Sequence, residues 1–334
     1  MSENLQWILK QRPQGNVSDD DIVLERNPAP TASDGELVLR TEYISLDPAN
    51  RAWMNETATY MEPVALDGPM AGLMMGEVVE SGSDQFAVGD RVMGLGSWSR
   101  FCQVQAQAFS KVPEVPGLDA REVFAFLMIV GPTAYFGIND ICAPKAGETV
   151  VVSGAAGAVG SIAGQLAKAR GCCVVGIAGG SRKCRLIVDD YGFDAAIDYR
   201  GENVAKRLAD LCPDGIDCFF DNVGGDILSA VLGQVNDFAR IAQCGAISTY
   251  NDEKPQPGPY NYVNVVIRRV KIQGFIVMDF MDRYPEAYGA LAQLRAQGGL
   301  KWKIHEEQGL ENMLNVFRKL FSGENEGKLL LKVD

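Results

Sequence analysis

The stretch Thr149–Gly171, with the sequence TVVVSGAAGAVGSIAGQLAKARG, constrains the fold of this chain more than any other. It opens with mostly β-branched residues, Thr149–Ser153, which predict a short buried strand. Gly154, Gly157 and Gly160 follow at steps of three, and apolar residues then recur at helical spacing until the next glycine. The stretch therefore predicts a strand, a glycine turn and a helix.

This glycine turn predicts a binding site for a phosphate-bearing ligand. The first N–H groups of a helix are unpaired and carry partial positive charge, so an anion can lie there. Glycines let the backbone approach a pyrophosphate closely, because a Cβ atom would block it. The place of the glycines between an apolar strand and a helix favours a dinucleotide site over a tight turn that binds nothing.

Length and charge limit the classes of protein to consider. A chain of 334 residues suggests two domains. The net charge of −12 disfavours binding to nucleic acid or to anionic membranes. No apolar run approaches the ~20 residues that span a bilayer, and the first residues lack the apolar core of a signal peptide. We therefore expect a cytoplasmic protein.

The possible metal ligands are few and scattered. His305 is the only histidine, and none of the eight cysteines forms a C-x-x-C pair. A catalytic zinc ion takes about three protein ligands, and a structural zinc ion takes clustered cysteines. We expect no metal site and no mechanism that needs a histidine base.

The pattern of elements changes along the chain. Residues 1–120 predict a β-rich, barrel-like domain, with strands at 36–45, 75–82, 88–94 and 101–104. Strands then alternate with helices, which predicts a doubly wound parallel sheet. The predicted strands are 149–153, 172–177, 195–197, 217–221, 239–244 and 271–277. The predicted helices of this part are 121–127 and 133–139, with Gly131–Pro132 between them, 181–191 with Ser181 as its cap, 202–211 and 226–236. Helices at 284–297 and 309–322 and a strand at 328–333 complete the chain.

The segment after the second predicted strand of the sheet indicates which dinucleotide binds. In a dinucleotide fold this position faces the adenosine ribose, where a carboxylate favours NAD and basic residues hold the 2′-phosphate of NADP. Ser181, Arg182 and Lys183 occupy it, and no carboxylate follows until Asp189. The segment predicts NADP(H), against the alternative of ordinary surface cations at a helix start.

Several motifs together resemble those of the zinc-independent medium-chain dehydrogenase/reductases. Within that family the chain is similar to the prostaglandin reductase and alkenal double-bond reductase group, which includes curcumin-reductase-like enzymes. The motifs cover nearly the whole chain in order and are Leu46–Pro48 with Arg51, Thr133–Gly137, Ala155–Ser161, Asp221–Gly225, Cys244–Asn251, Gly309–Asn312 and Gly323–Lys328.

The resemblance implies a fold and a set of cofactor contacts. It implies an α/β protein, with a Rossmann NADP-binding domain at 122–298 and a β-rich, GroES-like catalytic domain at 1–121 with 299–334. The implied contacts to NADPH/NADP, together with those expected above from the sequence, are Gly157, Ala158, Val159, Gly160, Ser161, Ser181, Arg182, Lys183, Tyr199, Asn222, Cys244, Gly245, Ala246, Ile247, Ser248, Thr249, Tyr250, Phe275, Ile276, Val277 and Asn325.

The resemblance also implies a reaction, the reduction of the C=C bond of a small, apolar enone or enal. Hydride transfer to the β-carbon produces an enolate, and Tyr250 is the candidate donor to its oxygen. Tyr60, Phe275 and Met278 are candidates for the substrate pocket, although such apolar residues also occur in ordinary cores. A homodimer is expected as well, because the predicted strand 271–277 is last in the sheet and leaves an open edge.

Two other functions fit the same sequence. An NADPH:quinone oxidoreductase shares this fold and needs no zinc. A protein of another class, a non-catalytic sensor that binds NADPH without turnover, would retain the same cofactor motifs.

Overall fold

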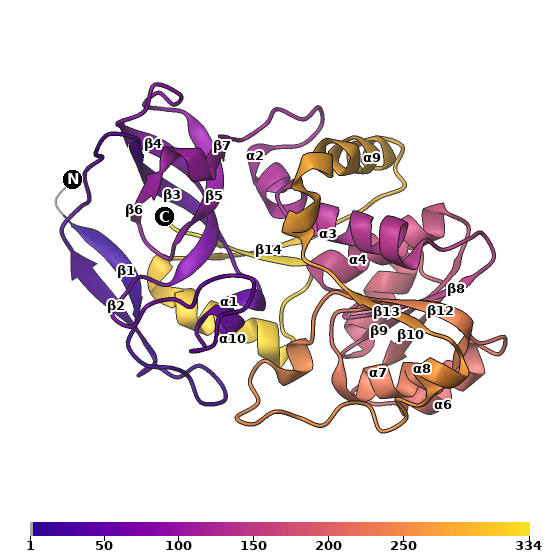
Figure 1. Cartoon of the computed structure of the whole chain (residues 1–334). Helices are drawn as coiled ribbons and strands as arrows, with labels where there is room; N and C mark the ends of the chain where they lie inside the picture. Colours follow the sequence, from indigo (N-terminus) through magenta and orange to yellow (C-terminus); the bar gives the residue numbers. More distant parts are fainter. Residues whose placement is uncertain (1–2) are drawn as a thin grey trace. The chain divides into compact units, whose positions relative to one another are not determined.

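The computed structural model describes residues 3–334, and the chain divides into two compact units (Figure 1). The first unit comprises Met1–Ala125 with Ile304–Asp334, and the second comprises Phe126–Lys303. The first unit is rich in β-strands and the second alternates strands with helices. This mixed α/β architecture confirms the predicted fold class.

A seven-stranded sheet forms the centre of the first unit. Its order is β14-β15-β3-β4-β5-β7, and β6 also pairs with β3. The bounds are β3 Glu36–Ser45, β4 Ala71–Ser81, β5 Arg91–Ser97, β6 Phe101–Gln105, β7 Phe109–Lys111, β14 Ile304–Gln308 and β15 Lys328–Lys332. A separate pair, β1 (Asn4–Leu9) and β2 (Ile22–Asn27), accompanies it, with the short helices α1 (Ala49–Trp53) and α2 (Ala120–Glu122).

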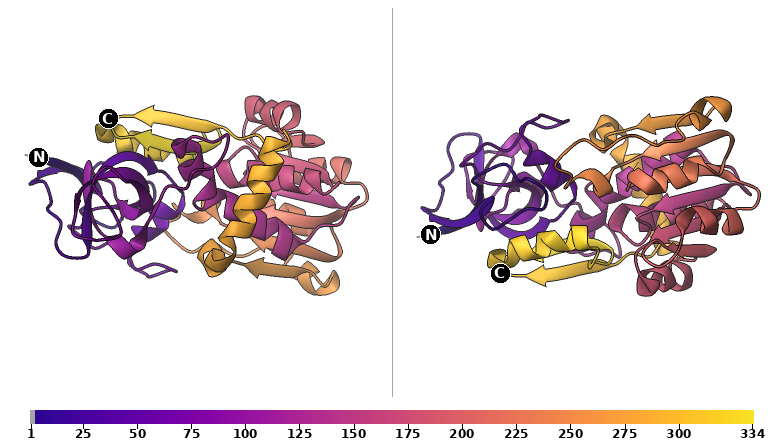
Figure 2. Two further views of the ribbon diagram at one scale, coloured as in Figure 1. Left: turned by 90° about the horizontal axis from the view of Figure 1, so that it is seen from above. Right: turned by 90° about the horizontal axis from the view of Figure 1, so that it is seen from below.

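The end of the chain returns to this sheet. β15 has the sequence KLLLK and pairs antiparallel with β3, so its three leucines enter the core of the first unit. Helix α10 (Met313–Ser322) packs its buried face into the same core, where Phe317 contacts Trp98 edge-to-face at 5.2 Å between ring centroids. Figure 2 shows these C-terminal elements, in yellow, beside the indigo and purple N-terminal strands. The predicted last strand is therefore confirmed.

The second unit contains six parallel strands in the order β10-β9-β8-β11-β12-β13. Their bounds are β8 Thr149–Ser153, β9 Cys173–Ala178, β10 Ala195–Asp198, β11 Ile216–Asp221, β12 Val235–Gln243 and β13 Lys271–Gly274. In Figure 1, α3 and α4 lie above this sheet and α6 and α7 below it. The helices are α3 Val130–Phe136, α4 Ala158–Ala169, α5 Ser181–Arg185, α6 Val204–Leu211, α7 Gly225–Leu232, α8 Asn264–Ile267 and α9 Tyr284–Ala296. A doubly wound sheet is the arrangement that the alternating pattern predicts.

Three predicted boundaries are wrong. Gly131–Pro132 does not separate two helices but lies in the first turn of α3, where proline is tolerated because its missing N–H would be unpaired there anyway. The helix predicted at 226–236 ends at Leu232, and Val235 already belongs to β12. Ser181 does not cap α5: the N-cap is Gly180, whose φ of 90° favours glycine.

One helical run passes the length and composition test for crossing a membrane. Two π-helical stretches, Val123–Leu127 and Gly137–Cys142, join α2 and α3 into a run from Ala120 to Cys142 with mean hydropathy 1.3. The sequence alone did not predict a segment of this length. In the tested window 67% of the residues are buried inside the protein, as in the core helix of a globular protein.

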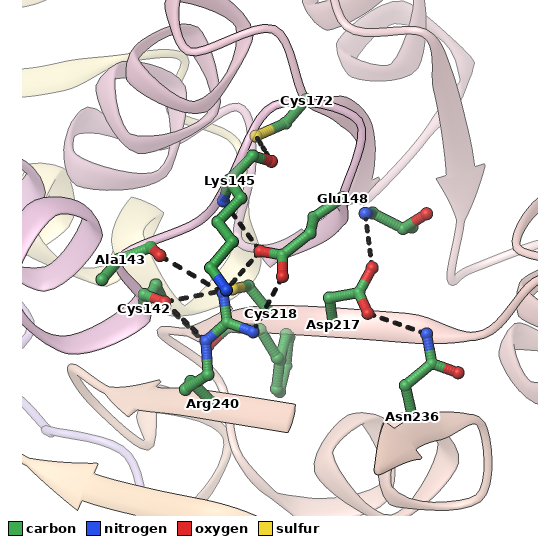
Figure 3. A network of polar contacts seen from close by, with 11 residues as sticks. Cys142, Ala143, Lys145, Glu148, Cys172, Asp217, Cys218, Asn236 and Arg240 are labelled. Atoms are coloured by element: carbon green, nitrogen blue, oxygen red, sulfur yellow. Dashed lines mark hydrogen bonds and ion pairs between the residues drawn. The ribbon is translucent and has the colours of Figure 1, made fainter. Parts of the chain in front are cut away.

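Arg240 binds the end of this run (Figure 3). From β12 its Nε donates to the carbonyl of Cys142 at 2.9 Å, and Nη2 donates to the carbonyl of Ala143 at 3.3 Å. The guanidinium also pairs with Glu148, with Nη1 and Oε1 3.2 Å apart. A cation at a helix C-terminus is stabilised by the free carbonyls and the helix dipole. Arg240 therefore connects the helix end to both β12 and the turn before β8.

We predict that Arg240→Met lowers the stability of the protein. The substitution retains most of the aliphatic stem but removes the bonds to the carbonyls and to Glu148, whose side chain is only 20% exposed. The expected loss is about 1–2 kcal/mol, seen as a thermal midpoint roughly 2–4 °C lower. Arg268→Met is the matched control, because Arg268 pairs with Asp237 at the surface, where both side chains are about half exposed. Equal midpoints for the two variants would contradict this role of Arg240.

We also predict a homodimer. β13 is the last strand of the parallel sheet and pairs only with β12, so its other edge is open to a second chain. Light scattering at micromolar concentration should give about twice the chain mass of 36.2 kDa. A mass equal to that of one chain would contradict the prediction.

Candidate functional site

The glycine turn after β8 forms the start of α4. Gly157 is the N-cap of this helix and has no side chain to bond the first-turn N–H groups, which leaves them available to an anion. A Cβ atom on Gly160 would lie 2.4 Å from the carbonyl oxygen of Gly154, so only glycine fits there. Gly154 itself has φ +59°, in the left-handed region. The turn therefore has the backbone geometry that the sequence predicted.

Asp221, fully buried at the end of β11, holds together the carboxyl ends of three strands. Its Oδ1 accepts hydrogen bonds from Ser153 Oγ at 2.7 Å and from the two backbone N–H groups at positions 223 and 224. Its Oδ2 accepts from Gln243 Nε2 at 3.2 Å. Burial nevertheless raises the pKa of Asp221, against the lowering effect of these donors.

Asn222 is positioned beside the glycine turn by this network. Its backbone N–H donates to Ser153 Oγ at 2.8 Å, and its side-chain Nδ2 donates to the carbonyl of Ser153 at 2.7 Å. The Asn222 Cβ atom lies 3.4 Å from the place where a side chain on Gly154 would begin. The structure thus brings two predicted cofactor contacts, the turn and Asn222, to the same edge of the sheet.

The loop after β12 is tied to the same edge. The N–H groups of Cys244 and Gly245 donate to the carbonyl of Asp221 at 2.8 and 3.1 Å. Ser248 donates its N–H and its hydroxyl to the carbonyl of Val223, at 3.2 and 2.6 Å. Seven predicted contacts, Cys244–Tyr250, therefore lie next to the glycine turn in a fixed loop.

Tyr250 ends this loop with a hydroxyl that can donate. Its Oη accepts the N–H of Ala246 at 3.2 Å, and among residues 3–334 no hydrogen bond uses its own proton. Burial raises the pKa of Tyr250 above its ordinary value. The hydroxyl therefore stays protonated at neutral pH and can donate one hydrogen bond to a developing oxyanion.

The segment after β9 carries the predicted phosphate contacts. Arg182 is exposed and Lys183 is half-buried, both on α5. A carboxylate that the local sequence does not reveal lies near them: Asp198, at the end of β10, accepts the N–H of Gly180 at 2.7 Å. Sequence reasoning missed Asp198 because it approaches from the neighbouring strand.

The remaining predicted residues are more dispersed. Phe275, just after β13, packs edge-to-face against Phe220 and Phe280, with ring centroids 6.4 and 6.5 Å away. Met278 is 38% exposed. Tyr60 and Asn325 belong to the first unit, so their approach to a cofactor in the second unit stays a prediction.

Asp221 is the principal residue that the sequence analysis did not assign. It was noted only as the neighbour of Asn222. A signal existed, because a carboxylate that ends an apolar strand and precedes Asn-Val-Gly-Gly needs hydrogen-bond donors if it is buried.

Comparison with known proteins identifies the family. Residues 5–112 match the model described as the N-terminal domain of oxidoreductase, and residues 158–293 match the one described as zinc-binding dehydrogenase. The chain is 36% identical to the NADPH-dependent curcumin reductase of Escherichia coli over 335 residues, covering 99% of this chain and 97% of that protein. It is 35% identical to the 2-alkenal reductase (NADP(+)-dependent) of Nicotiana tabacum, covering 99% and 97%. The chain belongs to the medium-chain dehydrogenase/reductase family.

A solved member of this family has nearly the same fold. The crystal structure of CurA from Vibrio vulnificus in complex with NADPH superposes with a TM-score of 0.93 at 37% sequence identity, and 99% of each chain is covered. The resemblance inferred from the motifs is therefore confirmed.

The donor set of this family member differs from that of a zinc enzyme. Among the described residues 3–334, no three His, Cys, Asp or Glu side chains are grouped so that they could hold a metal ion. His305 instead lies 3.1 Å from Glu307, Nε2 to Oε1, and accepts the backbone N–H of Glu326. The zinc in the family model's description therefore has no counterpart in these side chains.

Proposed function

We propose that this protein is an NADPH-dependent reductase of the C=C bond of α,β-unsaturated aldehydes and ketones. The observation that carries the proposal is the Tyr250 hydroxyl, a protonated donor on a loop fixed next to the glycine turn. The names of the relatives, a curcumin reductase and a 2-alkenal reductase, support the same reaction class.

The residues around the turn fit the cofactor. The first-turn N–H groups of α4 would hold the pyrophosphate, and Asn222 with the loop Cys244–Tyr250 would contact the nicotinamide side. Ser181, Arg182 and Lys183 would hold the 2′-phosphate, with Tyr199 beside the adenine. Bound NADPH would supply the hydride that the substrate's β-carbon receives.

The chain's own contribution is to orient the substrate and stabilise its charge. As the β-carbon is reduced, negative charge develops on the carbonyl oxygen. A hydrogen bond from Tyr250 Oη to that oxygen lowers the energy of the enolate without a metal ion. Tyr60, Phe275 and Met278 remain our candidates for residues that bind the apolar part of the substrate.

The product of the reaction tests this function. NADPH should convert an α,β-unsaturated aldehyde or ketone to the saturated carbonyl compound, identified by NMR. An allylic alcohol as the product would overturn the proposal, because it requires reduction of the carbonyl. Stopped-flow oxidation of NADPH by a quinone but not by an enal would favour a quinone oxidoreductase. Oxidation by neither would favour a non-catalytic NADPH-binding protein.

A further inference from the structure

We infer that Arg200 is a specificity-determining residue that binds the 2′-phosphate of NADPH from the end of β10. The inference rests on the proposed cofactor and extends its site to a second segment. Arg200 lies outside the set of residues expected from the sequence to contact the cofactor.

The register of the sheet brings the two segments together. β9 and β10 are parallel neighbours, and Asp198, the last residue of β10, pairs with Ala178, the last residue of β9. Because both strands end at the same level, the residues that follow them lie side by side. Tyr199 and Arg200 thus approach Gly179–Gly180, which lead into the basic helix α5.

The contact at Gly179 places the Arg200 side chain. A Cβ atom on Gly179 would lie 3.0 Å from Arg200 Nε and 2.9 Å from Tyr199 Oη. Both side chains therefore lie directly against the Gly179 backbone, and only glycine leaves room for them. The guanidinium reaches the point in the fold where a 2′-phosphate is bound.

Asp198 fixes this arrangement through the backbone. Its Oδ1 accepts the N–H of Gly180 at 2.7 Å and the N–H of Arg200 at 3.0 Å. One carboxylate oxygen thus joins the turn after β9 to the turn after β10. These two donors occupy that oxygen, which leaves the Arg200 guanidinium for the planar, bidentate binding of a phosphate that arginine favours.

The chemistry of the ligand follows from these charges. Arg182, Lys183 and Arg200 surround one glycine turn in a chain whose net charge is −12. A local basic cluster in an acidic protein attracts a dianion such as a phosphate monoester. Neutral ribose hydroxyls gain much less from it, so Arg200 discriminates NADPH from NADH.

Equilibrium binding tests the inference without turnover. We expect Arg200→Ala to raise the Kd of NADPH about 10-fold in isothermal titration calorimetry and to change the Kd of NADH by less than about 2-fold. Adenosine 2′,5′-bisphosphate should lose affinity in parallel with NADPH, and 5′-AMP should not. Arg200→Lys should lie between Arg200→Ala and the unsubstituted protein, since it retains the charge but not the planar fork.

Lys206→Ala is the matched control. It removes an equally exposed positive charge from α6, on the segment that follows Arg200. Its Kd for NADPH should stay within about 2-fold of the unsubstituted protein, because exposed charges beyond the site are screened by salt. Arg200 is itself exposed, so its replacement should leave the thermal midpoint unchanged.

The possible outcomes separate this inference from the proposed function. If the unsubstituted protein binds NADPH no more tightly than NADH, the proposed cofactor preference fails. If it prefers NADPH but Arg200→Ala leaves both Kd values unchanged, only the role of Arg200 is overturned. Equal losses for NADPH and NADH would also overturn it, since they would show a general disturbance of the adenosine site.

Discussion

Replacing Lys183 by alanine should weaken NADPH binding by roughly 10- to 100-fold and leave NADH binding nearly unchanged. A hydrogen bond to a charged group contributes about 1.5–3 kcal/mol, and only NADPH offers a 2′-phosphate to this ammonium group. Lys183 is half-buried on α5, so water and salt should screen its charge less than that of an exposed lysine. The Kd values of both cofactors, measured by calorimetry, test the prediction.

The same helix offers a control. Arg185 is an exposed cation two residues further along α5. Residues two apart on a helix do not share a face, so Arg185→Ala should leave both Kd values almost unchanged. Lys183→Arg should retain part of the preference for NADPH. Equal losses for NADPH and NADH in Lys183→Ala would show that Lys183 does not contact the 2′-phosphate.

Elements with a strong local pattern could be predicted from the sequence. The strand and helix around the glycine turn follow from β-branched residues and helical periodicity, and the structure has them as β8 and α4. The apolar run KLLLK likewise predicted β15. In these stretches the burial of each side chain agrees with the local propensity, so no tertiary information was needed.

Elements that depend on tertiary pairing were missed. β14 has the polar sequence IHEEQ, and it is a strand because it pairs in parallel with β15. β1 and β2 pair with one another across a loop of twelve residues, 10–21, without a strong alternation. The propensity of a strand depends on its neighbours, which the local sequence does not reveal.

The candidate site shows the same division. The sequence indicated the glycine turn and the basic residues of α5, because both are contiguous motifs. Asp198 and Asp221 act on segments from other strands, through the register of the parallel sheet. The Ser181 cap was wrong for a related reason: the carboxylate that binds the turn at Gly180 comes from β10.

Tyr250→Phe should lower kcat more than it changes KM. Losing one donor to a developing oxyanion costs about 2.7–4 kcal/mol, or roughly 10²–10³ in kcat. A ribose hydroxyl of the cofactor can share this role, so we expect a loss at or below the low end of that range. Because the hydrogen bond forms chiefly in the transition state, kcat and kcat/KM should fall together.

The ring of Tyr250 is not the subject of this substitution, since phenylalanine retains it. The variant does remove the acceptor of the Ala246 N–H, so the Kd of NADPH must be measured beside the kinetics. Tyr260→Phe is the matched control, because Tyr260 is 89% exposed, and its kcat should be unchanged. A fall in kcat together with an equal fall in cofactor affinity would indicate a disturbed loop instead of a lost donor.

The pH dependence gives a second measure of the same hydroxyl. Burial raises the pKa of Tyr250 above its ordinary value of 10.0, so the donating form persists as the pH rises through neutrality. Activity that depends on this donor should stay level from about pH 6 to 9 and decline only at higher pH. In Tyr250→Phe the alkaline decline should disappear along with most of kcat. If the variant keeps both the full kcat and the same alkaline limb, the enolate oxygen is stabilised by another group.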